Sequence, residues 1–178
     1  LVDVLRQDPR VDVHEGMNVR YLDPEAIGGP ADLTVADLSF ISLTLVIGPL
    51  AAATRPGGSL LLMVKPQFEV GREKLEKAGV VLDPLKHRMA VARVVAAAMT
   101  ENLRVAGLAR SPLPGQNGNV EFFLWLQVPQ AQDPAEERSE DPQSAARSLV
   151  DAAFDGFDGP GPEPVTDRFA QAAHSTGD

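Results

Sequence analysis

Residues 59–65 read Ser-Leu-Leu-Leu-Met-Val-Lys, an apolar run that ends on a charged side chain. Such a run, with no polar residue in alternation, is typical of a strand in the middle of a parallel sheet, because that strand is buried on both faces. Lys65 falls at the carboxyl end of the strand, where open α/β sheets bind their ligands. The stretch therefore predicts a central strand and a candidate site.

Strands and helices alternate around this run. We expect further strands near 11–15, 33–37, 103–110 and 120–128, and helices near 40–54 and 84–102. Pro56-Gly57-Gly58 reads as a turn, and Asp83 followed by Pro84 is typical of a helix start. Alternating elements predict a parallel sheet of βαβ units, whereas the loop 111–119, which has no helix, predicts that the last two strands pair antiparallel. The fold class is α/β.

Charge divides the chain into two parts. Residues 1–128 carry 14 acidic and 13 basic side chains, whereas residues 129–178 carry 11 acidic and three basic ones. The second part also holds six prolines and few bulky apolar residues, so it buries too little to offset chain entropy. We expect a domain over 1–128 and a disordered acidic tail over 129–178, with one marginal helix around 145–154.

Several classes of protein are disfavoured by composition. The chain has no cysteine and three scattered histidines, which argues against disulfides, a thiol nucleophile and a metal site. Its longest apolar stretches fall short of the ~18 residues of a membrane span, and no signal peptide is visible. We expect a soluble protein of the cytoplasm, or a piece of one.

Three charged residues are expected to meet at one edge of the sheet. Asp37 and Lys65 close two strands, and Glu121 opens the last strand, which runs in the opposite direction. A lysine between two carboxylates can accept a proton from an alcohol if its ammonium is neutralised. The same three residues would equally suit a structural ion pair that caps the sheet.

The segment after Lys65 suits contact with RNA. Phe68 is followed by Arg72, Lys74 and Lys77, and basic side chains beside an aromatic ring fit phosphate contact with base stacking. A solvated basic loop is the alternative interpretation. The loop 111–119, rich in proline, glycine and asparagine, is either part of a site or a tight hairpin.

Four long motifs carry a resemblance to a known family. They are Asp-Leu-Ser-Phe-Ile-Ser-Leu at 37–43, Met-Val-Lys-Pro-Gln-Phe-Glu-Val-Gly-Arg at 63–72, Ser-Pro-Leu-Pro-Gly at 111–115 and Gly-Asn-Val-Glu-Phe-Phe-Leu-Trp at 118–125. Over residues 1–128 the chain resembles the TlyA family, described as ribosomal RNA 2′-O-methyltransferases and often labelled hemolysins. That family resembles FtsJ/RrmJ-type methyltransferases of the class I fold. The tail from residue 129 resembles no family that we can name.

The resemblance implies roles for individual residues. The family's site is a Lys-Asp-Lys-Glu tetrad, whose last three members match Asp37, Lys65 and Glu121. Lys65 would help deprotonate the ribose 2′-hydroxyl of a nucleotide in ribosomal RNA, which we expect to be a cytidine, while Asp37 would place that hydroxyl beside the methyl donor. That donor is S-adenosylmethionine. Asn18 and Val19 would lie near its adenine, and Asp37 and Leu38 near its methionine part.

Several family features have no counterpart in this chain. These are the first lysine of the tetrad, the glycine-rich loop after the first strand, the acid at the end of the second strand, and an S4-like RNA-binding domain. In the class I strand order 3-2-1-4-5-7-6, residues 11–15 would be strand 3, and strands 1 and 2 would be missing. We therefore expect a carboxy-terminal fragment that is inactive alone.

Two other functions remain open on the sequence. The chain could be a non-enzymatic remnant that binds RNA or a protein partner but cannot hold the cofactor. A pore-forming hemolysin is suggested by the family's label alone, and the lack of a membrane-length or basic amphipathic helix speaks against it.

Overall fold

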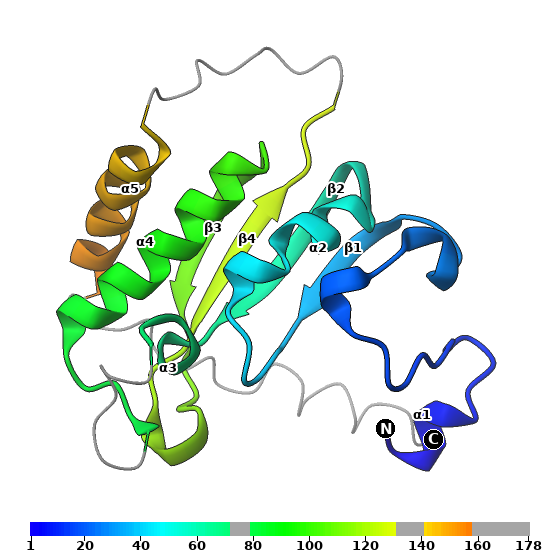
Figure 1. Cartoon of the computed structure of the whole chain (residues 1–178). Coiled ribbons are helices and arrows are strands. Elements are labelled where there is room, and N and C mark those ends of the chain that lie inside the picture. The colour runs from blue at the N-terminus through cyan, green and yellow to red at the C-terminus, as the bar shows by residue number, and fades with distance from the viewer. Residues whose placement is uncertain (72–78, 131–140, 158–178) are drawn as a thin grey trace, which may run out of the picture.

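The computed structural model of the chain describes residues 1–71, 79–130 and 141–157. Its elements are α1 (Asp3–Arg6), η1 (Val19–Tyr21), η2 (Pro24–Ile27), β1 (Ala31–Ala36), η3 (Leu43–Leu45), α2 (Ile47–Ala52), β2 (Thr54–Val64), α3 (Pro66–Glu69), α4 (Pro84–Thr100), β3 (Arg104–Arg110), η6 (Gln116–Gly118), β4 (Phe122–Gln127) and α5 (Pro142–Phe157), where η marks a 3₁₀ helix. Helices α2 and α4 lie on one side of the sheet, and α5 packs beside α4 (Figure 1).

The four strands of the described residues form a mixed sheet in the order β1-β2-β4-β3. β1 and β2 are parallel, while β4 runs antiparallel to both β2 and β3. This is the arrangement of the last four strands in the class I order, 4-5-7-6. The α/β class and the antiparallel pairing of the last two strands are thus confirmed.

The core lies between the sheet and α4. Leu60, Leu62 and Val64 of β2 alternate with half-buried residues and face the helices, where α4 contributes a buried row that includes Val91 and Val94. α4 starts as predicted: the Asp83 side chain accepts a hydrogen bond from the Leu85 amide, and proline occupies the first turn. Helix 84–102 is confirmed with its end two residues earlier.

The predicted helix 40–54 is shorter and divided. It consists of η3, whose N-cap is Ser42, and α2, with Val46 at a non-helical φ of −128° between them. The helix does not begin at residue 40 as predicted, because Phe40 has a left-handed φ of 62°. The predicted turn at 56–58 lies inside β2, where the register with β1 shifts and Gly57 has a φ of 76°.

The prediction of a strand at 11–15 is wrong. These residues pair with no strand of the described chain, and their side chains form local contacts instead, such as that between His14 and Asp12. An extended segment of five residues needs a neighbouring strand for its backbone hydrogen bonds, and it does not reach the free edge of β1.

The prediction of a tail without tertiary contacts is wrong for residues 142–157. The marginal helix expected at 145–154 is the longer α5, which buries Ala146, Val150 and Phe154. The centroid of the Phe154 ring lies 5.0 Å from that of Phe122. The guanidinium carbon of Arg88, on α4, lies over the Phe154 ring at 5.1 Å from its centroid. A helix with three small or apolar residues on one face can bury that face on α4 despite the acidic composition around it. The rest of the predicted tail, 131–140 and 158–178, lies outside the described residues.

The other face of the sheet carries apolar side chains that no described helix covers. Leu33 and Val35 of β1 are exposed, and Val35 is paired in register with Leu61, which is paired with Trp125. Paired residues share a face, so these side chains lie opposite the buried Leu60 and Leu62. Trp125 is 46% exposed. A sheet with one bare apolar face is typical of half of a three-layer fold.

Candidate active site

Three charged side chains meet at one edge of the sheet. Asp37 follows β1, Lys65 follows β2 and Glu121 precedes β4, and the pairing of Val64 with Phe122 brings the last two side by side. Lys65 Nζ lies 2.5 Å from Asp37 Oδ1 and 3.9 Å from Glu121 Oε1. The predicted convergence of these three residues is confirmed. Their roles in a reaction stay a prediction.

The two carboxylates differ in their access to solvent. The side chains of Lys65 and Glu121 are 13% and 10% exposed, whereas that of Asp37 is 64% exposed. The ammonium therefore has one buried and one open partner. A molecule that reaches Lys65 would approach along the Asp37 side, where the site is open.

The loop between β3 and β4 covers Glu121. A Cβ atom at Gly115 would overlap the Glu121 carboxylate, so a larger residue there would require the Glu121 side chain or the loop to shift. Asn119, which is buried, accepts from the Val81 amide at 3.1 Å and donates to the Gly79 carbonyl at 3.3 Å. The loop 111–119 is therefore a part of the wall of the site as well as a hairpin. The sequence marked the loop but not Asn119.

Glu69 is a site residue that the sequence did not single out. It is 3% exposed, and its carboxylate accepts hydrogen bonds from Ser42 Oγ at 2.5 Å and from the Leu43 amide at 2.8 Å. Burial raises the pKa of the Glu69 carboxyl, while the bonds from Ser42 and Leu43 and the charge of Arg93 act in the opposite direction. The sequence signal that could have identified Glu69 is its position four residues after Lys65.

Phe40 is a second residue that the sequence did not single out. The residue is 88% exposed, and the centroid of its ring lies 5.2 Å from that of Phe68, at a tilt of 52°. The left-handed backbone conformation of Phe40 costs free energy, and it persists only where the surrounding residues hold it. Phe40 and Phe68 thus present an apolar surface that belongs to the same two chain segments as Asp37 and Lys65.

The residues predicted near the cofactor lie in two places. Asn18 is exposed and caps η1, its side chain accepting from the Arg20 amide at 3.1 Å. Val19 and Leu38 are half-buried and pack against the core. The structure therefore anchors both segments on the core.

Of the residues predicted to bind RNA, Phe68 lies on α3 beside the site. Arg72, Lys74 and Lys77 fall outside the described residues.

Within the described ranges, no group of three or more histidine, aspartate or glutamate side chains could hold a metal ion. None of the helices in those ranges is long and apolar enough to cross a membrane.

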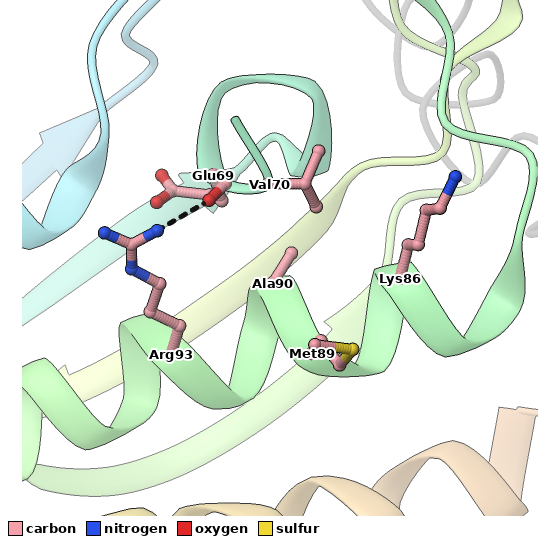
Figure 2. Close-up of a pocket in the computed structure, with 6 residues that line it drawn as sticks. All are labelled: Glu69, Val70, Lys86, Met89, Ala90 and Arg93. Carbon is pink, nitrogen blue, oxygen red and sulfur yellow. Dashed lines mark hydrogen bonds between the residues drawn. The ribbon is translucent and has the colours of Figure 1, made fainter. Parts of the chain in front are cut away.

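A small hollow lies between α3 and the first half of α4 (Figure 2). It is lined by Glu69, Val70, Lys86, Met89, Ala90 and Arg93. Arg93 Nη1 donates to the Glu69 backbone carbonyl at 3.0 Å, and Lys86 lies at the opposite end of the hollow (Figure 2). Asp37, Lys65 and Glu121 do not line it, so the hollow is separate from the charged cluster.

Known proteins are similar to this chain in sequence. The profile of the FtsJ-like methyltransferase family matches residues 1–128. The 16S/23S rRNA (cytidine-2′-O)-methyltransferase TlyA of Mycobacterium tuberculosis is 49% identical over 124 residues, which are 70% of this chain and 46% of that protein. YqxC of Bacillus subtilis is 41% identical over 126 residues, 70% of this chain and 45% of that protein. The chain spans about half the length of these relatives.

Solved structures are similar in fold. A protein of Streptococcus thermophilus described as a hemolysin has a TM-score of 0.70 at 35% identity, over 88% of this chain and 55% of that one. A protein of Lactococcus lactis with the same description has a TM-score of 0.68 at 32% identity, over 84% of this chain and 71% of that one. With a family match that spans residues 1–128 and a sheet order that agrees with it, this chain belongs to the family of FtsJ-like methyltransferases.

Proposed function

We propose that this chain is part of an enzyme that uses S-adenosylmethionine to methylate a ribose 2′-oxygen, of a cytidine, in ribosomal RNA. The observation that carries the proposal is the position of Lys65 Nζ, between Asp37 and Glu121 at the ligand-binding edge of an FtsJ-like sheet. The 49% identical relative is named for this reaction, which supports the substrate class.

The geometry suits proton transfer from a hydroxyl group. The cofactor, when bound, would supply a methyl group from its sulfonium sulfur, which is left as a neutral thioether when the S–CH3 bond breaks. The 2′-oxygen gains the methyl group and loses its own proton. Lys65 is the group that could take this proton, provided that it enters the reaction as the free amine. Asp37, open to solvent, would orient the hydroxyl, and buried Glu121 would hold the Lys65 side chain in place.

The donor groups present fit only a part of the cofactor. An open carboxylate at Asp37 and an amide at Asn18 suit the cationic and adenine parts of S-adenosylmethionine. No described residue is assigned to its carboxylate or to its ribose hydroxyls. We therefore expect weak binding of the cofactor by the 178-residue chain.

We further propose that the chain works joined to a second part of the same methyltransferase domain. The bare sheet face with Leu33, Val35 and Trp125 needs a covering layer, and β1 has an unpaired edge in the described residues. Residues 1–128 would then be the carboxy-terminal part of the domain, with α5 packed against α4.

For the RNA, Phe40 and Phe68 offer a stacking surface next to Lys65. Arg72, Lys74 and Lys77 follow in sequence and would supply phosphate contacts. Replacing Arg72 or Lys77 by alanine should weaken RNA binding and flatten its salt dependence, without a change in cofactor affinity.

The proposal is tested with two proteins. One is the 178-residue chain; the other, called the extended protein below, is this chain joined at Leu1 to the part of the Mycobacterium tuberculosis relative that precedes its matched segment. Transfer of tritiated methyl groups to ribosomal RNA is measured for both. We expect transfer by the extended protein and little by the chain alone. Failure of the extended protein to methylate RNA, while it binds the cofactor, would contradict the proposed reaction.

A further inference from the structure

Two chain segments carry the site, and they touch at three successive points. The segment 37–43 follows β1, and the segment 65–69 follows β2. The contacts are the ion pair of Asp37 with Lys65, the ring pair of Phe40 with Phe68, and the hydrogen bonds from Ser42 and Leu43 to Glu69. The relative position of the two segments is set by these three points together.

The contacts differ in how firmly they hold. The Asp37 carboxylate is 64% exposed and Phe40 is 88% exposed, so water competes with the first two contacts. Glu69 is 3% exposed, and its carboxylate receives one hydroxyl and one amide donor. Hydrogen bonds to a buried carboxylate are short and strong, so the third contact is the one that fixes the distance between the segments.

The conformation of the first segment also needs this support. Phe40 has a φ of 62°, and a residue other than glycine keeps such a conformation only where its surroundings hold it. Ser42 and Leu43, two and three residues after Phe40, are the residues that donate hydrogen bonds to the Glu69 carboxylate. The second segment is itself fixed to α4, because Arg93 donates to the Glu69 carbonyl (Figure 2).

We propose that Glu69 is a positioning residue, whose buried carboxylate holds the loop of Asp37 and Phe40 in register with Lys65. The inference rests on the proposed function only where it concerns the rate of methyl transfer; the alignment of the two segments can be measured without it. Glu69 is too buried to touch RNA or cofactor, so it acts through Asp37 and Lys65. Its loss should lower turnover and leave the affinity for both substrates unchanged.

The alignment is tested on the 178-residue chain by nuclear magnetic resonance. The chain has four lysines, and a Lys65→Arg variant identifies the side-chain ammonium signal of Lys65 among them. In Glu69→Gln this signal should move toward that of a free lysine, because a neutral amide, with one acceptor oxygen, holds Ser42 and Leu43 more weakly than the charge-assisted bonds to the carboxylate do. Glu25→Gln, which removes an exposed charge, is the matched control and should leave the signal in place. An unchanged Lys65 signal in folded Glu69→Gln would overturn the proposal.

A second variant covers the case in which Glu69→Gln does not fold. Ser42→Ala removes one of the two hydrogen bonds to Glu69, together with the N-cap bond that Ser42 Oγ accepts from the Thr44 amide, and it should move the Lys65 signal in the same direction by a smaller amount. If the signal stays in place in Ser42→Ala as well, the proposal is wrong. The double variant should move it no further than Glu69→Gln does, since the two residues act through one contact.

Activity of the extended protein supplies the second readout. Glu69→Gln should lower kcat by about 10- to 100-fold, the range that a small misplacement of reacting groups produces, with both KM values unchanged. A full kcat in Glu69→Gln would overturn the inference and leave the proposed function standing. An inactive parent and an inactive Glu25→Gln control would count against the proposed function instead, and the Lys65 signal would still decide the alignment.

Discussion

Lys65 Nζ lies 2.5 Å from Asp37 Oδ1, although the two residues close different strands of the sheet. The parallel pairing of β1 with β2 brings these strand ends to one edge, and Glu121 reaches the same edge because β4 runs the other way. A lysine is thus placed at the position where open α/β sheets bind ligands, with one carboxylate buried beside it and one in solvent.

Gly115→Ala should disturb the site through Glu121. A Cβ atom at this position would overlap the Glu121 carboxylate, and it would have to push either the loop or the acid away from Lys65. We expect methyl transfer by the extended protein to fall at least tenfold, which corresponds to about 1.4 kcal/mol in the barrier. Gly107→Ala is the matched control, because its new Cβ would lie 3.6 Å from Trp125, an ordinary contact. Equal activity of the two variants would show that the loop does not constrain Glu121.

Trp125 reports on the bare face of the sheet. It is the single tryptophan of the chain and is 46% exposed. In the extended protein its fluorescence should shift to shorter wavelength and be quenched less by acrylamide than in the 178-residue chain, because a covering layer removes it from water. An unchanged emission and equal quenching in both proteins would contradict the proposed second part of the domain.

The stability of the protein should depend on pH through Glu69. Burial raises its pKa above the ordinary value of 4.5, so the folded state holds this proton more tightly than the unfolded state does. The stability that Glu69 contributes through this proton is fully present below pH 4.5 and is lost as the pH rises through the raised pKa of Glu69. The free energy of unfolding of the parent, relative to Glu69→Gln, should therefore decline over this range and then level off. Urea unfolding of both proteins at a series of pH values measures it, and a constant difference would contradict the assignment.

Phe154→Ala should destabilise the body of the chain. The Phe154 ring is buried between Phe122 and Arg88, so its removal leaves a cavity that costs about 3 kcal/mol. Arg88→Ala should have a smaller effect, because its partners Asp151 and Asp155 are largely exposed. Urea unfolding compares the two variants, and a loss below about 1 kcal/mol for Phe154→Ala would mean that α5 is not a stable part of the fold.

The sequence predicted those features that depend on local pattern. The apolar run at 59–65, the cap at Asp83 and the short loop at 111–119, in which the structure has only the 3₁₀ turn η6, were sufficient to predict β2, α4 and the antiparallel pair. The charge at each strand end then predicted the cluster of Asp37, Lys65 and Glu121, since strand direction alone brings these ends together.

What the sequence did not predict depends on contacts between distant residues. The segment 11–15 has a strand-like pattern, but a strand needs a neighbour, which pattern does not show. α5 is stabilised by burial of Phe154 against Phe122, which lies far away in sequence. The role of Glu69 in joining two loops follows from hydrogen bonds to residues 26 and 27 positions earlier.

The most direct test of the proposed reaction is methyl transfer by the extended protein with Lys65→Ala. If Lys65 takes the proton of the 2′-hydroxyl, incorporation of tritiated methyl groups into ribosomal RNA should fall by about 10²- to 10⁴-fold, with cofactor affinity unchanged. Lys86 lies outside the cluster of Asp37, Lys65 and Glu121, so Lys86→Ala is the matched control and should keep full activity. Unchanged incorporation with Lys65→Ala would remove Lys65 from the reaction and contradict the account of the site given above.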